Sequence, residues 1–171
     1  GRVSRLIVAD MSPLSYVSKG ERAVHFAGHE YIMNALLSLD LQDIESLRDA
    51  SIKLEEAFPD IGLRQFLLKN LHKNDAGLYE WQLNLEVLLK NLDSLGDGLD
   101  PDQYPSEGFR QYPALFIRGE NSAYISDRDV KAIKRLFPAS NLVSILGAGH
   151  WLHAEQPEIF VKIVKKFLLE Y

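Results

Sequence analysis

Cysteine is absent from the 171 residues, which excludes a disulfide framework, a thiolate metal site and a cysteine nucleophile. No apolar run approaches the roughly 18 residues that a membrane-spanning helix needs, and no signal peptide is visible. Positive charge is scarce as well, because 19 Lys and Arg residues stand against 24 Asp and Glu, a net charge of -5. Phosphate binding requires a basic face, so this balance argues against nucleic acid as a partner.

Patterns for binding nucleotides and metals are also missing. Neither G-x-x-x-x-G-K nor G-x-G-x-x-G occurs, and Gly147-Ala-Gly149 alone is too short to indicate a dinucleotide site. His25 and His29 are four residues apart on an expected helix, but no carboxylate pattern such as H-E-x-x-H accompanies them. We interpret both as ordinary polar positions and expect neither a metal nor a cofactor.

Three short apolar segments, each followed by turn-forming residues, predict buried parallel strands at about 5–10, 113–118 and 142–146. A helix is expected at about 127–137 with Ser126 or Asp127 as its N-cap, and a final helix follows Pro157. Alternating strands and helices indicate a parallel sheet covered by helices. Because a parallel strand needs neighbours and the first one begins near Gly1, we expect further strands outside these residues.

Between about 20 and 100 the pattern changes to one amphipathic helix after another. Apolar residues at helical spacing mark these segments: Ile44, Leu47, Leu54 and Phe58; Phe66, Leu67 and Leu71; Leu85, Leu88, Leu89 and Leu92; and a less regular stretch at 22–39. A linker rich in Gly, Pro and Asp returns the chain to the sheet. We expect residues 20–104, linker included, to form an all-helical cap inserted into a core of 1–19 and 105–171.

The segment Gly147-Ala-Gly-His-Trp-Leu-His-Ala-Glu-Gln-Pro157 carries the strongest chemical signal. It places His150 after a predicted strand and a glycine turn, at the carboxyl edge of the sheet where α/β proteins gather their ligands. A histidine there can act as a general base, and a structural or merely exposed loop histidine is the alternative. His153 shares the loop without the turn, and we interpret it as structural or substrate-flanking.

Asp10 ends the first predicted strand at the same edge of the sheet. Its carboxylate can accept the other imidazole N–H of His150 and fix the tautomer. The alternative is that Asp10 caps the turn that follows it. A phosphatase of the phospho-aspartyl type is disfavoured because the second carboxylate it needs two residues later is replaced by Ser12.

Three segments together resemble the small α/β-hydrolase esterases: Arg5-Leu-Ile-Val-Ala-Asp-Met-Ser-Pro13, Pro113-Ala-Leu-Phe-Ile-Arg-Gly-Glu-Asn-Ser-Ala-Tyr-Ile125 and the histidine segment described above. The resemblance is to bacterial acyl-ester and thioesterase-like members and their mitochondrial relatives, and it covers essentially the whole chain. It implies an α/β fold, namely the C-terminal portion of the α/β-hydrolase parallel sheet with an inserted helical cap.

Carried over position by position, the resemblance implies that His150 is the catalytic histidine. Many α/β-hydrolases place the acid in a Gly-x-x-Asp turn, where this chain has Ser122. The resemblance therefore points to Asp10 as the acid, with Glu86 and Asp127 ranked below it.

The aromatic residues Phe66, Tyr79 and Trp81 of the cap, together with Trp151, are expected to contact the acyl group. Ordinary core packing is the alternative for the cap residues. The nucleophile elbow of the family, Gly-x-Ser-x-Gly, precedes the first strand seen here and occurs nowhere in the chain.

We therefore expect the C-terminal portion of a serine hydrolase for carboxylic esters or thioesters that is inactive by itself. Its expected partners are a small acyl ester or thioester and the missing N-terminal half of the fold, which would cover the edge of the first strand. The resemblance favours an intracellular protein, cytoplasmic or mitochondrial. The alternative function is a non-catalytic binding domain derived from the same fold.

Overall fold

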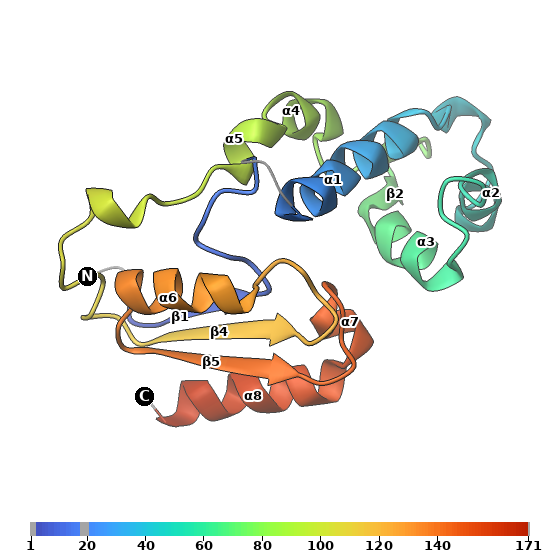
Figure 1. Cartoon of the computed structure of the whole chain (residues 1–171). Coiled ribbons are helices and arrows are strands. Elements are labelled where there is room, and N and C mark those ends of the chain that lie inside the picture. The colour runs from blue at the N-terminus through green and yellow to red at the C-terminus, as the bar shows by residue number, and fades with distance from the viewer. Residues whose placement is uncertain (1–2, 18–20, 171) are drawn as a thin grey trace. The chain divides into compact units, whose positions relative to one another are not determined.

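The computed structural model describes residues 3–17 and 21–170 (Figure 1). The chain divides into two compact units. Gly1–His25 and Gly96–Tyr171 form the first, here called the sheet unit, and Phe26–Leu95 form the second, here called the inserted unit. The predicted insertion, 20–104, is longer at both ends than this second unit. Within the described residues, no helix has the length and hydrophobicity of a transmembrane segment.

Three parallel strands form the sheet of the first unit: β1 (Leu6–Ala9), β4 (Ala114–Gly119) and β5 (Ser140–Ile145). Their order is β1-β4-β5, with Leu6 opposite Ala114 and Ala114 opposite Ser140. The central strand β4 is buried along nearly its whole length, as its uninterrupted apolar run requires. The predicted α/β fold with a parallel sheet is confirmed.

Alternate side chains of β4 point to opposite faces of the sheet. Leu115 and Ile117 pack in one apolar cluster with Phe167 of α8 (Pro157–Glu170), while Phe116 packs in another with Ile133 of α6 (Asp127–Leu136). Figure 1 shows α6 and α8 on opposite sides of the strands. Burial of each large apolar side chain contributes about 1.5–3 kcal/mol, so β4 holds both helical layers to the sheet.

The helix α6 begins with a capping box. The backbone N–H and the hydroxyl of Ser126 both donate to Oδ2 of Asp129, at 2.7 Å each. Asp129 thereby satisfies a donor at the start of the helix, and its negative charge is favoured at that end. Ser126 is the N-cap, one of the two residues predicted for this position.

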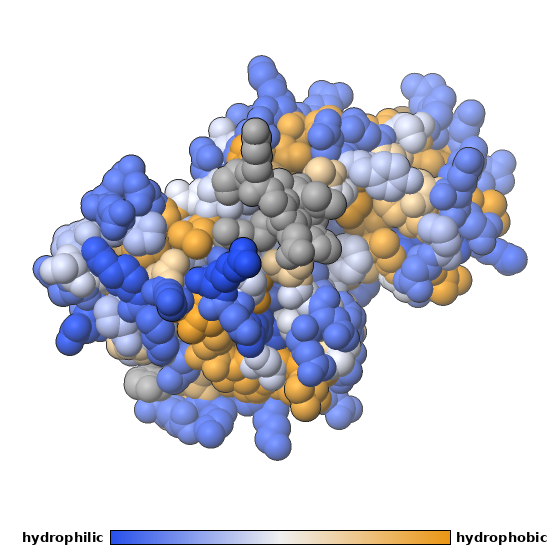
Figure 2. All heavy atoms as spheres, viewed as in Figure 1, coloured by the Kyte–Doolittle hydropathy of each residue, from blue (hydrophilic) through white to orange (hydrophobic). Residues whose placement is uncertain are grey.

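The two outer strands are only partly covered. Leu6, Ile7 and Val8 of β1, like Leu142 and Val143 of β5, are half-buried. Hydrophobic residues reach the surface between α6 and α8 in the space-filling view (Figure 2). Among the described residues, β1 pairs with β4 alone, so its other edge carries no strand. An apolar strand with an unpaired edge favours pairing with another strand.

The inserted unit is built mainly from short helices. They are α1 (Glu21–Leu37), which begins in the sheet unit, α2 (Leu47–Lys53), α3 (Ile61–Leu67), α4 (Leu85–Lys90) and α5 (Leu92–Gly96), with 3-10 turns at Leu41–Asp43, Leu68–Asn70 and, in the sheet unit, Pro101–Gln103. Leu36, Leu54, Phe58 and Leu68 are among the buried residues of its core. Helices α1, α2 and α4 fall on three of the predicted amphipathic segments, whereas the segment from Phe66 to Leu71 holds only the end of α3 and a 3-10 turn.

The prediction of an all-helical insertion is wrong for residues 71–81. There β2 (Leu71–Lys73) and β3 (Tyr79–Trp81) form an antiparallel hairpin. Its turn contains Gly77 at φ +78°, and the Asn74 side chain accepts hydrogen bonds from the N–H groups of Ala76 and Leu78. Asn and Gly are typical hairpin-turn residues, and here this turn chemistry outweighs the helical spacing of the preceding apolar residues.

Candidate active site

Asp10 directly follows β1 and is fully buried, with 0% of its surface exposed. Its backbone has φ +50°, in the left-handed region, where Asp is tolerated better than most non-glycine residues. Its N–H donates to the carbonyl of Ile117 on β4 at 2.7 Å, so the residue is held where the sheet ends. An unusual backbone conformation at a buried carboxylate is an observation that points towards function.

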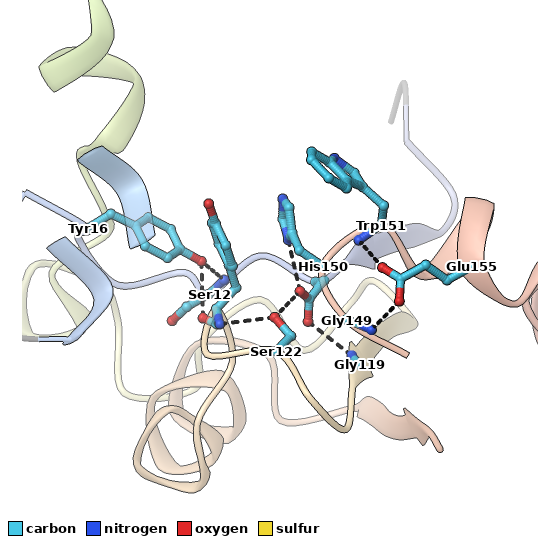
Figure 3. Close-up of polar contacts among 10 residues, drawn as sticks. Ser12, Tyr16, Gly119, Ser122, Gly149, His150, Trp151 and Glu155 are labelled. Atoms are coloured by element: carbon cyan, nitrogen blue, oxygen red, sulfur yellow. Dashed lines mark hydrogen bonds and ion pairs between the residues drawn. The ribbon is translucent and has the colours of Figure 1, made fainter. Parts of the chain in front are cut away.

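Three residues surround the Asp10 carboxylate, and Figure 3 labels each of them: Gly119, Ser122 and His150. The Gly119 N–H donates to Oδ1 at 3.1 Å, the Ser122 hydroxyl donates to Oδ2, and Nδ1 of His150 lies 2.9 Å from Oδ2. An ionised carboxylate only accepts hydrogen bonds, so the imidazole proton belongs on Nδ1. Nε2 is then left as an acceptor on a side chain that is 26% exposed. This arrangement is the one in which a histidine can act as a general base.

The loop that carries His150 is held by a carboxylate that follows it. Glu155, in the short helix α7 (Leu152–Glu155), accepts hydrogen bonds from the N–H of Gly149 at 2.7 Å and of Trp151 at 3.1 Å. Figure 3 shows the two contacts converging on the carboxylate of Glu155. Since both flanking amides are fixed by one side chain, the backbone of His150 has little freedom to move.

Gly119, at the end of β4, lies against the same loop. A Cβ atom at this position would lie 2.2 Å from the carbonyl oxygen of Gly149 and 2.6 Å from that of Ala148. Any larger residue would push these two segments apart. The small residue therefore allows the sheet end that donates to Asp10 to approach the loop that carries His150.

Tyr124 covers one face of the His150 imidazole. The two ring centroids are 3.7 Å apart and the rings are nearly parallel, with an interplanar angle of 15°. Tyr124 itself is buried, and its N–H donates to the Ser122 hydroxyl at 3.2 Å. Burial, and secondly the charge of Asp10, raise the pKa of the Tyr124 hydroxyl from 10.0 to about 12. Its ring is therefore uncharged at neutral pH.

No protein-family model matches the chain. Comparisons of its sequence and of its structure with known proteins both find lipases and esterases. The chain is 34% identical over 170 residues to the sn-1-specific diacylglycerol lipase ABHD11 of Xenopus tropicalis, and the alignment covers 97% of this chain and 49% of that protein. It is 29% identical to the esterase YbfF of Escherichia coli, covering 98% of this chain and 58% of that protein. The solved structure of an esterase from a marine microorganism matches with a TM-score of 0.84 and 36% identity, over 97% of this chain and 61% of that one.

The chain is related to the α/β-hydrolase esterases. It spans about half the length of the curated relatives it matches. The predicted resemblance to this family is thereby confirmed.

The two other candidate acids, Asp127 and Glu86, have different surroundings. Asp127 forms an ion pair with Arg118 at 2.7 Å, and its side chain is 90% exposed. Glu86 is an exposed residue of α4 in the inserted unit. Asp10 lies within hydrogen-bonding distance of His150.

The predicted acyl-contact residues divide between the two units. Trp151 is half-buried beside His150, with ring centroids 6.4 Å apart. Three aromatic residues pack against the apolar core of the inserted unit: Phe66, Tyr79 and Trp81. Core packing was the alternative to acyl contact for these residues.

Two other histidines that had been considered in the sequence lie against aromatic rings. His153 is exposed on α7 with its ring 6.0 Å from that of Phe160, and His29 lies on α1 with its ring 5.5 Å from that of Phe26. The side chain of His25 lies outside the described residues. No cluster of three potential ligands that could hold a metal ion occurs within the part of the chain that the structure describes.

Three residues of the candidate site were not predicted from the sequence. Ser122 was recognised only as a replacement for the usual acid, but its hydroxyl is a hydrogen-bond donor to Asp10. Glu155 could have been found from its position shortly after the histidine loop, since carboxylates commonly accept from turn amides. No sequence signal marks Tyr124, because its stacking on His150 depends on how separate loops pack.

Proposed function

We propose that this chain supplies the general base and its orienting acid to a serine hydrolase that acts on carboxylic esters or thioesters. The observation that carries the proposal is the contact between His150 Nδ1 and the fully buried Asp10, at 2.9 Å, where parallel strands end. The relationship to esterases supports the reaction class, and the names of the relatives support an acyl ester as substrate.

In the proposed reaction, Nε2 of His150 removes the proton of a serine hydroxyl as the serine attacks the acyl carbonyl. The imidazolium then gives this proton to the departing alcohol or thiol, and an acyl-serine remains. Water, deprotonated by the same histidine, attacks the acyl carbonyl. The bond between the acyl carbon and the serine oxygen breaks, the imidazolium returns its proton to the serine oxygen, and the carboxylic acid is released. Throughout both steps Asp10 keeps the proton on Nδ1 and stabilises the positive imidazolium by its charge.

We propose that the serine lies outside these 171 residues, which contain no Gly-x-Ser-x-Gly motif. The half-buried residues of β1 and its unpaired edge among the described residues support a further strand next to it. Without the serine and its oxyanion donors, the present chain by itself should not hydrolyse esters.

Trp151 is the aromatic residue that we propose to contact the acyl group, because it directly follows the base in the chain. Contact of Phe66, Tyr79 and Trp81 with the acyl group stays a prediction. An intracellular location, cytoplasmic or mitochondrial, also stays a prediction, and it is supported only by the relationship to the family.

The test is hydrolysis of p-nitrophenyl acetate by the complete protein, by the present 171 residues, and by two variants of the complete protein. His150→Ala should lower kcat by about 10⁴-fold or more, since the base is removed. His153→Ala is the matched control: its ring lies against Phe160, the structural role rather than the substrate-flanking one, so this variant should retain kcat. Activity of the 171 residues alone would contradict the proposal. If the complete protein contains the serine motif and is folded but inactive, the non-catalytic binding domain is the better account.

A further inference from the structure

The second feature of His150, besides its contact with Asp10, is the aromatic ring laid over it. The centroid distance of 3.7 Å and angle of 15° bring the Tyr124 and His150 rings into face-to-face contact. Asp10 contacts one nitrogen at the ring edge, whereas Tyr124 covers a whole face. The two contacts therefore restrain different motions of the imidazole: Asp10 selects which nitrogen points to it, and Tyr124 limits tilting of the ring plane.

We propose that Tyr124 is a positioning residue for the base: its ring face fixes the plane of the His150 imidazole and supports the positive charge that the ring acquires during the reaction. This inference rests on the proposed function, because it assigns Tyr124 a part in the same reaction. Tyr124 acts through His150 and is given no contact with substrate.

The electrostatic part follows from the charge distribution of aromatic rings. The face of a phenol ring is negative, so it attracts a cation that lies against it within about 6 Å. His150 is neutral while it waits for the serine proton and positive after it has taken that proton. The attraction is therefore stronger in the second state, and an interaction that strengthens as the reaction proceeds raises kcat.

The position of Tyr124 is itself fixed on both sides. Its carbonyl accepts a hydrogen bond from the Tyr16 hydroxyl at 3.2 Å, and the same hydroxyl accepts from the Ser12 N–H. Its N–H donates to Ser122, which in turn donates to Asp10. The ring of Tyr16 packs against that of Tyr124 with centroids 5.4 Å apart. Because these contacts restrain the Tyr124 ring, the ring can in turn restrain the imidazole that stacks on it.

The charged and titratable groups around His150 come from three segments. Asp10 follows β1, Tyr124 follows β4, and Glu155 of α7 binds the two amides that flank His150. Because the Tyr124 hydroxyl stays protonated at neutral pH, its ring contributes through its face and not through a net charge.

Three replacements of Tyr124 in the complete protein distinguish the effect of an aromatic ring face from the effect of side-chain volume. Tyr124→Phe keeps the ring and should keep kcat within about twofold of wild type. Tyr124→Leu fills the space without a ring and should lower kcat about tenfold while KM changes little. Replacement of Tyr124 with pentafluorophenylalanine keeps the ring shape and reverses the charge of its face, so kcat should again fall. Tyr31→Leu removes a tyrosine whose ring contacts Phe58 in the inserted unit, and it should leave kcat unchanged.

The second readout is the proton NMR resonance of the His150 Nδ1–H, which is expected far downfield because it is bonded to Asp10. It should remain sharp in Tyr124→Phe and broaden or vanish in Tyr124→Leu as the ring plane loosens. Unchanged kcat and an unchanged resonance in a folded Tyr124→Leu would overturn the proposal. If that variant does not fold, equal kcat for the phenylalanine and pentafluorophenylalanine proteins would overturn it. An inactive wild type would defeat the proposed function, while the resonance would still test the positioning by Tyr124.

Discussion

Asp10 and Asp129 are both fully buried carboxylates of the sheet unit, but their partners differ. Asp129 accepts hydrogen bonds from Ser126 and, at 3.0 Å, from the Ser12 hydroxyl, and its surroundings fix the start of a helix. Asp10 accepts from a backbone amide, a serine and an imidazole that is 26% exposed.

Burial alone does not mark a catalytic carboxylate, since both residues share it. The difference is that Asp10 is hydrogen-bonded to a partly exposed imidazole, a side chain that can act as a general base. On this account Asp10 serves the reaction and Asp129 serves the fold. The predictions below separate these two roles, from the largest expected effect to the smallest.

Asp10→Asn in the complete protein should lower kcat for p-nitrophenyl acetate by about 10⁴-fold. The side chain keeps its size, but an amide can donate to Nδ1 and thereby favour the tautomer with its proton on Nε2, which cannot accept the serine proton. Steady-state kinetics measure the loss, and circular dichroism checks that the variant is folded. A folded Asp10→Asn protein with wild-type kcat would remove Asp10 from the mechanism.

Gly119→Ala should disturb the Asp10 region from its backbone side. The added Cβ meets two carbonyl oxygens of the histidine loop, at 2.2 and 2.6 Å, so the unfolding free energy should fall by about 1–3 kcal/mol. The kcat should fall as well, because the His150 loop must move away from Asp10. Urea unfolding and ester hydrolysis measure the two effects.

Gly28→Ala is the control for that substitution, since a Cβ there meets nothing within 4 Å on α1. It should raise stability by up to about 1 kcal/mol through better helix propensity. If both glycine variants behaved alike, the close approach at Gly119 would have no energetic importance.

Asp129→Asn should lower stability and leave kcat nearly unchanged, whereas the main effect of Asp10→Asn should be on kcat. Loss of the charged acceptor weakens its bonds to Ser12 and Ser126, so the unfolding free energy should fall by about 2 kcal/mol. The kcat of the folded fraction should stay near that of wild type. A fall in kcat as large as that of Asp10→Asn, with stability unchanged, would erase the distinction between the two carboxylates.

The smallest expected effect concerns Tyr124 at alkaline pH. In the folded state, burial and the charge of Asp10 raise the pKa of the Tyr124 hydroxyl from 10.0 to about 12. The folded state therefore binds more protons than the unfolded state between these values, and stability falls as pH rises through that window. Urea unfolding from pH 9 to 11.5 should show a shallower decline for Tyr124→Phe. Identical slopes would mean that Tyr124 is not the residue responsible.

Much of the sheet unit could be predicted from the sequence, because buried parallel strands consist of short apolar runs and each ends at a turn. The placement of Asp10 and His150 at the same edge follows from that topology. The Ser122 and Tyr124 contacts could not be predicted, since they depend on how the loop after β4 folds back. In the inserted unit a hairpin with its turn at Asn74–Gly77 lies between two segments of helical apolar spacing, inside a block that was expected to be all helical.

The most direct test of the central claim is the rate at which a fluorophosphonate probe labels the serine of the complete protein. The probe reacts only with a serine whose hydroxyl is activated by a base. Wild type and Asp129→Asn should be labelled at similar rates, whereas labelling of Asp10→Asn and His150→Ala should slow by at least about 100-fold. Labelling of folded Asp10→Asn and His150→Ala at the wild-type rate would contradict the assignment of this pair as the base and its acid.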